Sequence, residues 1–173
     1  MDYQSVVAVL RNFSNILVTG PQRSGTTICA KMIASDLNLR YVDENEFKVD
    51  KLHMLLNILG KEQNIVMQAP GLSRFCHLLN GYDVAVVFMR RDIESIIQSQ
   101  ERIAWPSCNE KNELSKYGYD EGIISEIKYA YWDNYQKQVT KHHFEFHYDA
   151  LKSHPLWIDK EQRVDFKPRQ IEL

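Results

Sequence analysis

A glycine-rich segment near the N-terminus has the residue types that bind phosphate. Residues 20–27 read Gly-Pro-Gln-Arg-Ser-Gly-Thr-Thr, with two glycines five positions apart and two threonines after the second. The apolar residues 16–18 precede it and helically spaced residues follow, so it joins a predicted strand to a predicted helix. N–H groups at the start of such a helix point toward an anion, and the helix dipole favours negative charge there. The segment therefore predicts a phosphate-binding loop.

The cation of this loop stands at an unusual position. A nucleoside triphosphatase loop carries Lys directly after the second glycine, where it reaches the β- and γ-phosphates. Here that position holds Thr26, and the cation of the loop is Arg23, which precedes Gly25. This departure argues against ATP or GTP hydrolysis.

A second candidate phosphate contact follows the most apolar predicted strand, residues 84–89. Arg90 and Arg91 come directly after this strand, and Ser99 stands eight residues beyond Arg91. An arginine at a strand end and a serine two turns into the next helix can close on one phosphate, because the guanidinium offers a fork of donors. Read alone, adjacent arginines are more often a solvated surface pair.

Together these motifs resemble the nucleotide site of sulfotransferases that use 3′-phosphoadenosine 5′-phosphosulfate (PAPS). In that family the loop that binds the 5′-phosphosulfate consists of a basic residue, then Ser or Thr, then Gly-Thr-Thr. Its 3′-phosphate site consists of an Arg followed eight positions later by a Ser. The resemblance covers most of residues 14–158. It implies that the 5′ end of PAPS is bound by Arg23, Ser24, Gly25, Thr26 and Thr27, and the 3′-phosphate by Arg91 and Ser99. A weaker likeness over residues 146–155 implies that Tyr148 lies by the adenine.

The resemblance also implies the catalytic groups. Sulfuryl transfer needs cations on the reacting oxygens and a base for the acceptor's proton. Arg23 would stabilise charge on the leaving phosphate, and Glu44 falls where the tyrosylprotein branch of the family has a catalytic Glu. The alternative is that Asp43, Glu44 and Glu46 form a solvated acidic face.

Gln68 is a further catalytic candidate, at a position where many relatives have Lys on the transferring sulfuryl group. A glutamine can donate hydrogen bonds there but carries no charge, and charged donors form stronger bonds. With Gln in place of Lys, the protein could bind the nucleotide and yet transfer the sulfuryl group slowly or not at all.

Apolar runs and helical patterns alternate along the chain. This alternation predicts a three-layer α/β/α P-loop fold with a mainly parallel central sheet of about five strands, formed by residues 1–173 as a single domain. The expected strands are 16–18, 65–67, 84–89 and 144–148, and the expected helices are 28–37, 52–59, 72–80, one from residue 92, and 123–139. Residues 104–119 break the pattern and predict a long loop of the kind that forms functional lids.

The last long helix has apolar side chains at steps of four residues. They are Ile123, Ile127, Tyr131, Tyr135 and Val139. This spacing predicts that Tyr131 and Tyr135 pack into the core rather than form an acceptor wall, and we expect Trp132 in the core as well.

Composition excludes several classes of protein. Of the 173 residues 44% are hydrophobic and 25% charged, which is typical of a globular domain and not of a disordered chain or membrane bundle. A net charge of −2 gives no support for nucleic-acid binding. Three cysteines without a CxxC spacing, together with the lack of a signal-like or membrane-spanning apolar run, predict a reduced, cytoplasmic protein.

A metal site is not predicted. His143, Glu145 and His147 would share one strand face, but no Cys or further carboxylate stands at ligand spacing.

The sequence thus predicts a small cytoplasmic sulfotransferase. It would move a sulfuryl group from PAPS to a hydroxyl or amine of a small-molecule or peptide acceptor, without a metal, nucleic acid or membrane. One alternative is a P-loop kinase acting on a small molecule, which would need Mg²⁺ and the loop lysine. The other is a nucleotide-binding module that has lost transferase activity, for which Gln68 is the discriminating residue. The acceptor and the oligomeric state are beyond the sequence.

Overall fold

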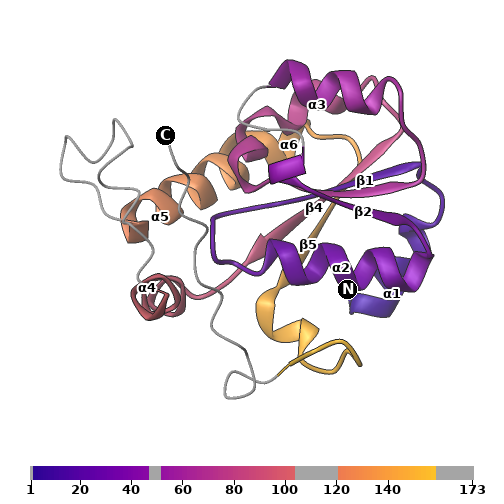
Figure 1. Ribbon diagram of the computed structural model, residues 1–173. Coiled ribbons are helices and arrows are strands. Elements are labelled where there is room, and N and C mark those ends of the chain that lie inside the picture. The colour runs from indigo at the N-terminus through magenta and orange to yellow at the C-terminus, as the bar shows by residue number, and fades with distance from the viewer. Residues whose placement is uncertain (1, 47–51, 104–120, 159–173) are drawn as a thin grey trace.

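The computed structural model describes residues 2–46, 52–103 and 121–158 and has a five-stranded sheet between two layers of helices (Figure 1). The strand order is β2-β3-β1-β4-β5, and every neighbouring pair is parallel. The strands are β1 (Asn15–Thr19), β2 (Arg40–Asp43), β3 (Ile65–Gln68), β4 (Val84–Arg90) and β5 (His143–His147). The predicted three-layer α/β fold is confirmed.

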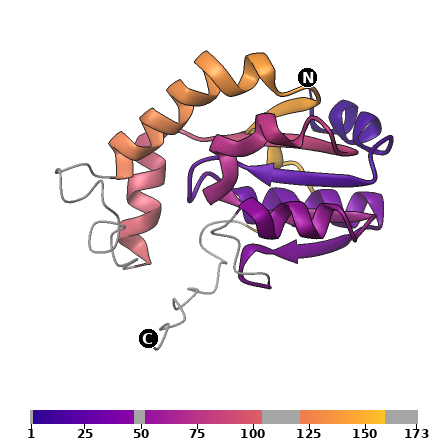
Figure 2. The same ribbon diagram turned by 90° about the horizontal axis from the view of Figure 1, so that it is seen from above.

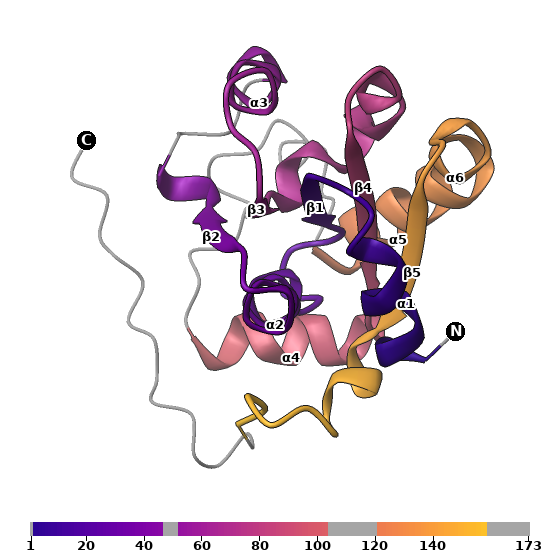
Figure 3. The ribbon, with the colours of Figure 1, turned by 90° about the vertical axis from the view of Figure 1, so that its right-hand side faces the viewer.

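The helices divide between the two faces of the sheet, as the view in Figure 3 shows for α2 and α3. One layer contains α1 (Tyr3–Leu10) and α2 (Thr26–Leu37). The other contains α3 (Leu52–Leu59), the 3₁₀ helix η2 (Pro70–Leu79), α5 (Glu121–Tyr131), the π-turn η5 (Trp132–Gln136) and α6 (Lys137–Val139). Two short 3₁₀ helices, η1 (Glu44–Glu46) and η6 (Tyr148–Leu151), follow β2 and β5. Helix α4 (Ile93–Arg102) lies beside α5 beyond the carboxyl ends of the strands (Figure 2).

The central strands are buried on both faces, which is why they read as continuous apolar runs in the sequence. Successive side chains of a strand point to opposite faces. In β1, Ile16 and Val18 pack into the cluster with α1 and α2, whereas Leu17 packs into the cluster with α3 and η2. A parallel sheet brings the carboxyl ends of β1, β3 and β4 to one edge, and the chain after each of them can contribute to one site.

Two elements were not predicted from the sequence. Helix α1 is a short amphipathic helix capped by Asp2, whose side chain accepts from the Ser5 N–H at 2.9 Å. Strand β2 lies at the sheet edge and buries only Val42, so it has no apolar run.

The predicted helix at 72–80 is instead the 3₁₀ helix η2, which starts at Pro70.

The predicted core stripe of α5 was wrong. Four of its five members are exposed, Ile127 by 46% and Tyr131, Tyr135 and Val139 by 41% each, and Ile123 is half-buried. The buried face of this segment carries Ile124, Ser125, Trp132 and Gln136 instead. Three hydrogen bonds stabilise this face in the buried position. The Trp132 indole donates to Glu145, Gln136 donates to the Arg74 carbonyl, and Gln136 accepts from the His77 N–H. The expectation that Trp132 lies in the core is confirmed, because its ring stacks on Phe88 at 4.3 Å.

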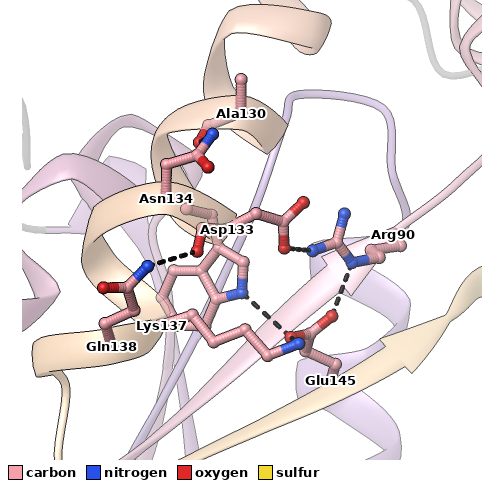
Figure 4. A network of polar contacts seen from close by, with 8 residues as sticks. Arg90, Ala130, Asp133, Asn134, Lys137, Gln138 and Glu145 are labelled. Carbon is pink, nitrogen blue, oxygen red and sulfur yellow. Dashed lines mark hydrogen bonds and ion pairs between the residues drawn. The ribbon is translucent and has the colours of Figure 1, made fainter.

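An ion network ties α5 and its extension to the sheet (Figure 4). Glu145 of β5 accepts from Arg90 Nε at 2.6 Å, from Lys137 Nζ at 2.6 Å and from Trp132 Nε1 at 3.2 Å, and Arg90 also pairs with Asp133. Burial alone would raise the pKa of Glu145, but these hydrogen bonds outweigh it and lower the pKa to about 2. Arg90 is therefore committed to the scaffold, which leaves Arg91 as the arginine for the site.

Candidate phosphate-binding site

The loop between β1 and α2 has a backbone that only glycine fits at two positions. Gly20 has φ of +137° and Gly25 has φ of +98°. A Cβ on Gly20 would lie 2.7 Å from the Met89 carbonyl oxygen, and a Cβ on Gly25 would lie 2.4 Å from Cδ2 of Tyr148. Arg23 also has a positive φ, of 64°, which non-glycine residues rarely adopt. The loop is thus held in a tight, strained turn of the kind that aims backbone N–H groups at an anion.

The residues after Arg23 build the start of α2. Ser24 is fully buried, and its hydroxyl donates to the Pro21 carbonyl at 2.6 Å, so it holds the loop shape. Gly25 is the N-cap, and the Cys29 N–H makes the first intrahelical bond to the Gly25 carbonyl at 3.0 Å. The exposed Thr27 lies in the first turn, where N–H groups have no intrahelical acceptor. This helix start is a suitable phosphate cradle.

Two arginines come together at the edge of this loop. Arg23 donates from Nε and Nη2 to Ser99 Oγ at 3.2 and 3.1 Å, and Arg91 donates from Nη1 to the Arg23 carbonyl at 2.9 Å. The structure thus brings Arg23, Arg91 and Ser99 together, but Ser99 binds Arg23 directly instead of joining Arg91. Two guanidinium groups of like charge at one edge create a local positive potential that an anionic ligand would neutralise.

Tyr148 packs between the loop and Arg91. Its ring lies 4.1 Å beneath the Arg91 guanidinium carbon and 5.1 Å, edge to face, from the Trp157 ring. The same ring fills the space beside Gly25, and it is 7% exposed. Tyr148 therefore supports the arginine and the loop from the end of β5, and its predicted place by an adenine stays a prediction.

Glu44, Gln68 and Thr26 form a second group on the other side of the loop. Gln68, at the end of β3, donates from Nε2 to Thr26 Oγ1 at 3.3 Å and also hydrogen bonds Glu44. Burial raises the pKa of Glu44 to about 7, and the charge of Asp43 acts in the same direction, whereas Gln68 and the charge of Lys128 oppose it. Glu44 is half-buried, whereas Glu46 of the same turn is exposed. A carboxyl with a pKa near neutrality is suited to act as a general base.

Two residues of α5 act on this region in ways that the sequence did not indicate. The Tyr129 hydroxyl accepts from the Arg91 N–H at 2.9 Å and donates to the Arg91 carbonyl at 2.8 Å. Lys128 acts electrostatically on Glu44. The signal that could have found Lys128 is its spacing of four residues before Trp132, a residue expected in the core.

The histidines of β5 have other partners. His143 Nδ1 lies 2.8 Å from the Thr140 carbonyl, and His147 pairs with Asp149 at 3.2 Å. Within residues 2–46, 52–103 and 121–158, no three His, Cys, Asp or Glu side chains gather closely enough to hold a metal ion. In that same part of the chain, no helix has the length and apolar character needed to span a membrane. The predicted lid at 104–119 lies outside the described residues.

Comparison with solved structures supports the fold. The shikimate kinase from Acinetobacter baumannii in complex with shikimate superposes with a TM-score of 0.53 at 16% identity, over 81% of this chain and 87% of that one. The shikimate kinase from Bacteroides thetaiotaomicron gives 0.49 at 16% identity, over 77% and 86%. The YorR protein from Bacillus subtilis, in complex with phosphorylated GDP, gives 0.48 at 13% identity, over 79% and 86%. No protein-family model and no curated protein matches the chain.

The fold, a five-stranded parallel α/β sheet with a glycine-rich loop after β1, is thus the fold that this shikimate kinase also has. The prediction of a PAPS-dependent sulfotransferase, with PAPS as co-substrate, was wrong: the superposed fold is that of a shikimate kinase. The physical reason is that the two motifs describe only how a chain holds a tetrahedral anion. Helix N–H groups and a guanidinium fork bind phosphate and sulfate alike, so short motifs of this kind do not separate the two chemistries. Ser99 Oγ accepts from Arg23 in this structure, and its predicted role beside Arg91 stays a prediction.

Proposed function

We propose that the protein is a P-loop kinase that moves a phosphoryl group from a nucleoside triphosphate to a hydroxyl group of a small molecule. The observation that carries this proposal is the link from Glu44 through Gln68 to Thr26, the first residue of α2. It joins a candidate base to the phosphate cradle through one buried amide. Phosphoryl transfer requires this pairing, because the acceptor hydroxyl must lie beside the transferring group while it loses its proton.

The nucleotide end of the site would be held by the loop and its two arginines. Backbone N–H groups at the start of α2 bind the phosphates, and Arg91 offers a guanidinium held over Tyr148 and bonded to the loop. Because Tyr129 fixes the Arg91 backbone from α5, this cation needs little further ordering when a ligand binds.

The chemistry is an in-line transfer. Glu44 accepts the proton of the acceptor hydroxyl as its oxygen forms a bond to the γ-phosphorus. The bond from that phosphorus to the bridging oxygen breaks, and its electron pair stays on the leaving nucleoside diphosphate. Helix N–H groups and arginines stabilise the charge that develops on the transferring group.

Kinase chemistry uses Mg²⁺, and the donor set at the loop fits this ion. Mg²⁺ takes oxygen ligands from one or two carboxylates, a hydroxyl and the substrate phosphates. Thr26 carries its hydroxyl at the start of α2, and Asp43 stands at the end of β2, in register with Gln68 of β3. These two residues would hold the ion. When bound, Mg²⁺ supplies neutralisation of charge on the β- and γ-phosphates.

A second candidate is a nucleotide-binding module without transferase activity. Thr26 occupies the position of the loop lysine, and Gln68 is uncharged, so both positions lack a cation toward the transferring group. This candidate shares the binding site with the kinase and differs from it only in turnover.

Calorimetric titration with ATP, GTP and ADP in the presence of Mg²⁺ tests the proposal. We expect nucleoside triphosphate binding that weakens about tenfold or more in Arg91→Ala, because a charge-assisted contact is lost. Arg11→Ala, at the end of α1, is the matched control and should bind as the parent does. Tighter binding of 3′-phosphoadenosine 5′-phosphate than of ATP would contradict the proposal.

A coupled assay for nucleoside diphosphate release, run on a panel of hydroxyl compounds that includes shikimate, then separates the two candidates. Turnover that is lost in Glu44→Gln, with nucleotide binding retained, supports the kinase. Binding without turnover on any acceptor supports the module.

A further inference from the structure

Helix α5 and its continuation through η5 and α6 carry a row of large apolar side chains on their outer surface. Ile127 is 46% exposed, and Tyr131, Tyr135 and Val139 are each 41% exposed. Single exposed apolar residues are common in globular proteins, but a contiguous exposed row is typical of a surface that another molecule covers. Figure 2 shows that this segment runs along the outside of the molecule.

The four residues stay on one side of the segment. In a regular α-helix of 3.6 residues per turn, a row at steps of four residues would slowly wind around the axis. The π-turn η5 has more residues per turn, through bonds between residues i and i+5, and this counteracts the winding. The Tyr131 and Tyr135 ring centroids lie 5.2 Å apart, and the Tyr135 ring lies 5.3 Å from the His77 ring. The row is therefore continuous with the neighbouring helix η2.

The row is flanked by uncharged residues on its solvent side. These exposed residues are Ala130, Asn134 and Gln138. The nearby charged residues Asp133 and Lys137 belong instead to the ion network around Glu145 (Figure 4). Protein–protein interfaces are likewise poor in charge at their centre and enriched in Tyr. The row thus has the composition of an interface centre.

Charges of opposite sign stand at the two ends of the row. Glu126, at the first end, is the residue before Ile127, and it is exposed. Lys141, at the other end, follows Val139 by two residues and is exposed as well. The Lys141 N–H donates to Asn80 Oδ1 at 2.8 Å, and Asn80 also donates to the Val139 carbonyl at 2.6 Å, so Lys141 stays beside the end of the row.

We propose that this row is the contact face of a homodimer, in which the segment of one copy lies antiparallel to the same segment of a second copy. In a two-fold interface, residue i contacts residue j of the partner, and residue j contacts residue i. When Tyr131 lies opposite the partner's Tyr135, Ile127 lies opposite the partner's Val139, because both pairs are symmetric about position 133. The row is thus self-complementary.

The end charges favour this antiparallel register. It brings Glu126 to the partner's Lys141, and the two-fold axis repeats the pair at the other end of the interface. A parallel pair would instead place the two Glu126 carboxylates together, which like charge disfavours. The second copy therefore matches the row in its apolar residues and in its charges.

The proposed contact is short. From Ile127 to Val139 the row is about 18 Å long, at 1.5 Å per residue. Interfaces of this small class are weak, so we expect a dimer that dissociates at roughly micromolar concentrations. The inference does not depend on the proposed kinase function.

Sedimentation velocity of the full chain between about 5 and about 500 μM tests the proposal, because dimerisation depends on protomer concentration. We expect the mass to rise with concentration from that of one chain, 20.3 kDa, toward that of two. Ile127→Glu should weaken the dimer at least about tenfold, since it places a charge against the partner's Val139. The matched control is Val9→Glu, at a 40% exposed residue of α1 in the other helical layer, and it should dimerise as the parent does. Thermal melting establishes that each variant is folded.

An exchange of charges tests the antiparallel register. Glu126→Lys and Lys141→Glu, each alone, place like charges together at both ends and should weaken the dimer about three- to tenfold. The double variant restores opposite charges and should recover the dimer of the parent.

The proposal is overturned if the parent stays monomeric over the whole range, since a different occupant would then cover the row. It is equally overturned if Ile127→Glu dimerises as the parent does, or if the two single charge variants leave the dimer unchanged. None of these outcomes bears on nucleotide binding, which the calorimetric titration measures separately.

Discussion

Burial of Glu44 should make the protein less stable at neutral pH, and Glu44→Gln should remove that effect. The pKa of this carboxyl rises from 4.5 to about 7 on folding, so the native state holds its proton more tightly than the unfolded chain. The stabilisation from the protonated form is complete below pH 4.5 and is lost as the pH rises from 4.5 through 7. One pKa unit corresponds to about 1.4 kcal/mol, which gives roughly 3 kcal/mol for the full shift.

Urea unfolding of the parent and of Glu44→Gln at about pH 5 and about pH 8 measures this effect. Between these two values most of the shift is traversed, and part of the group remains in contact with solvent. We therefore expect the parent to lose about 2 kcal/mol more unfolding free energy than the variant. Titrating groups that do not interact with Glu44 act equally on both proteins and cancel in the difference, whereas Asp43 and Lys128, whose charges act on Glu44, are part of the measured effect. The amide introduced by Glu44→Gln keeps an oxygen that can accept from Gln68, so the variant is expected to fold.

Glu46→Gln, on the same 3₁₀ turn but exposed, is the matched control and should track the parent. Equal pH dependence in the parent and Glu44→Gln would refute the reasoning, because it would mean that Glu44 is solvated in the native state. The same carboxyl links stability to activity: turnover should rise with pH through about 7 as the base ionises.

Three further outcomes test the site and its scaffold. Gly25→Ala should abolish nucleotide binding and lower the melting temperature, because its Cβ would meet the Tyr148 ring at 2.4 Å at a φ of +98°; calorimetric titration and thermal melting check this. Glu145→Ala should cost about 2–3 kcal/mol of unfolding free energy, because it removes the acceptor that Arg90, Lys137 and the buried Trp132 indole share, whereas Asp133→Ala, at a more exposed partner, should cost under about 1 kcal/mol; urea unfolding separates the two. Leu17→Ala, in the fully buried centre of β1, should cost about 2–5 kcal/mol in the same assay, with little effect on nucleotide affinity in whatever protein remains folded.

The central part of the fold was readable from the sequence because its signals are local. Strands β1, β3 and β4 are buried on both faces, so each is a short apolar run that stands out without knowledge of its neighbours. The signal of the glycine-rich loop is also local, since its glycines are required by the backbone conformation of a few residues. Edge strand β2 gave no such signal, because it buries Val42 alone.

The face of α5 could not be read in the same way. Two stripes of side chains along this helix could have packed against the sheet, and the more apolar of the two is exposed. Polar side chains decided the outcome: Trp132 and Gln136 find hydrogen-bond partners in β5 and η2, and those partners are known only once the elements pack. With this face turned inward, the Tyr129 hydroxyl lies where it bonds the Arg91 backbone.

By itself, the sequence determined that this protein has a parallel α/β fold with a tight glycine loop after its first core strand, since apolar runs and loop glycines act over a few residues. Tertiary structure alone decided which side chains meet at that loop and so which chemistry it can serve. Ser99 bonds Arg23 across 76 residues of chain, and Gln68 bonds Thr26 across 42. Contacts between residues so distant in the chain depend on how the strands order in the sheet, and no spacing of residues in the sequence records that order.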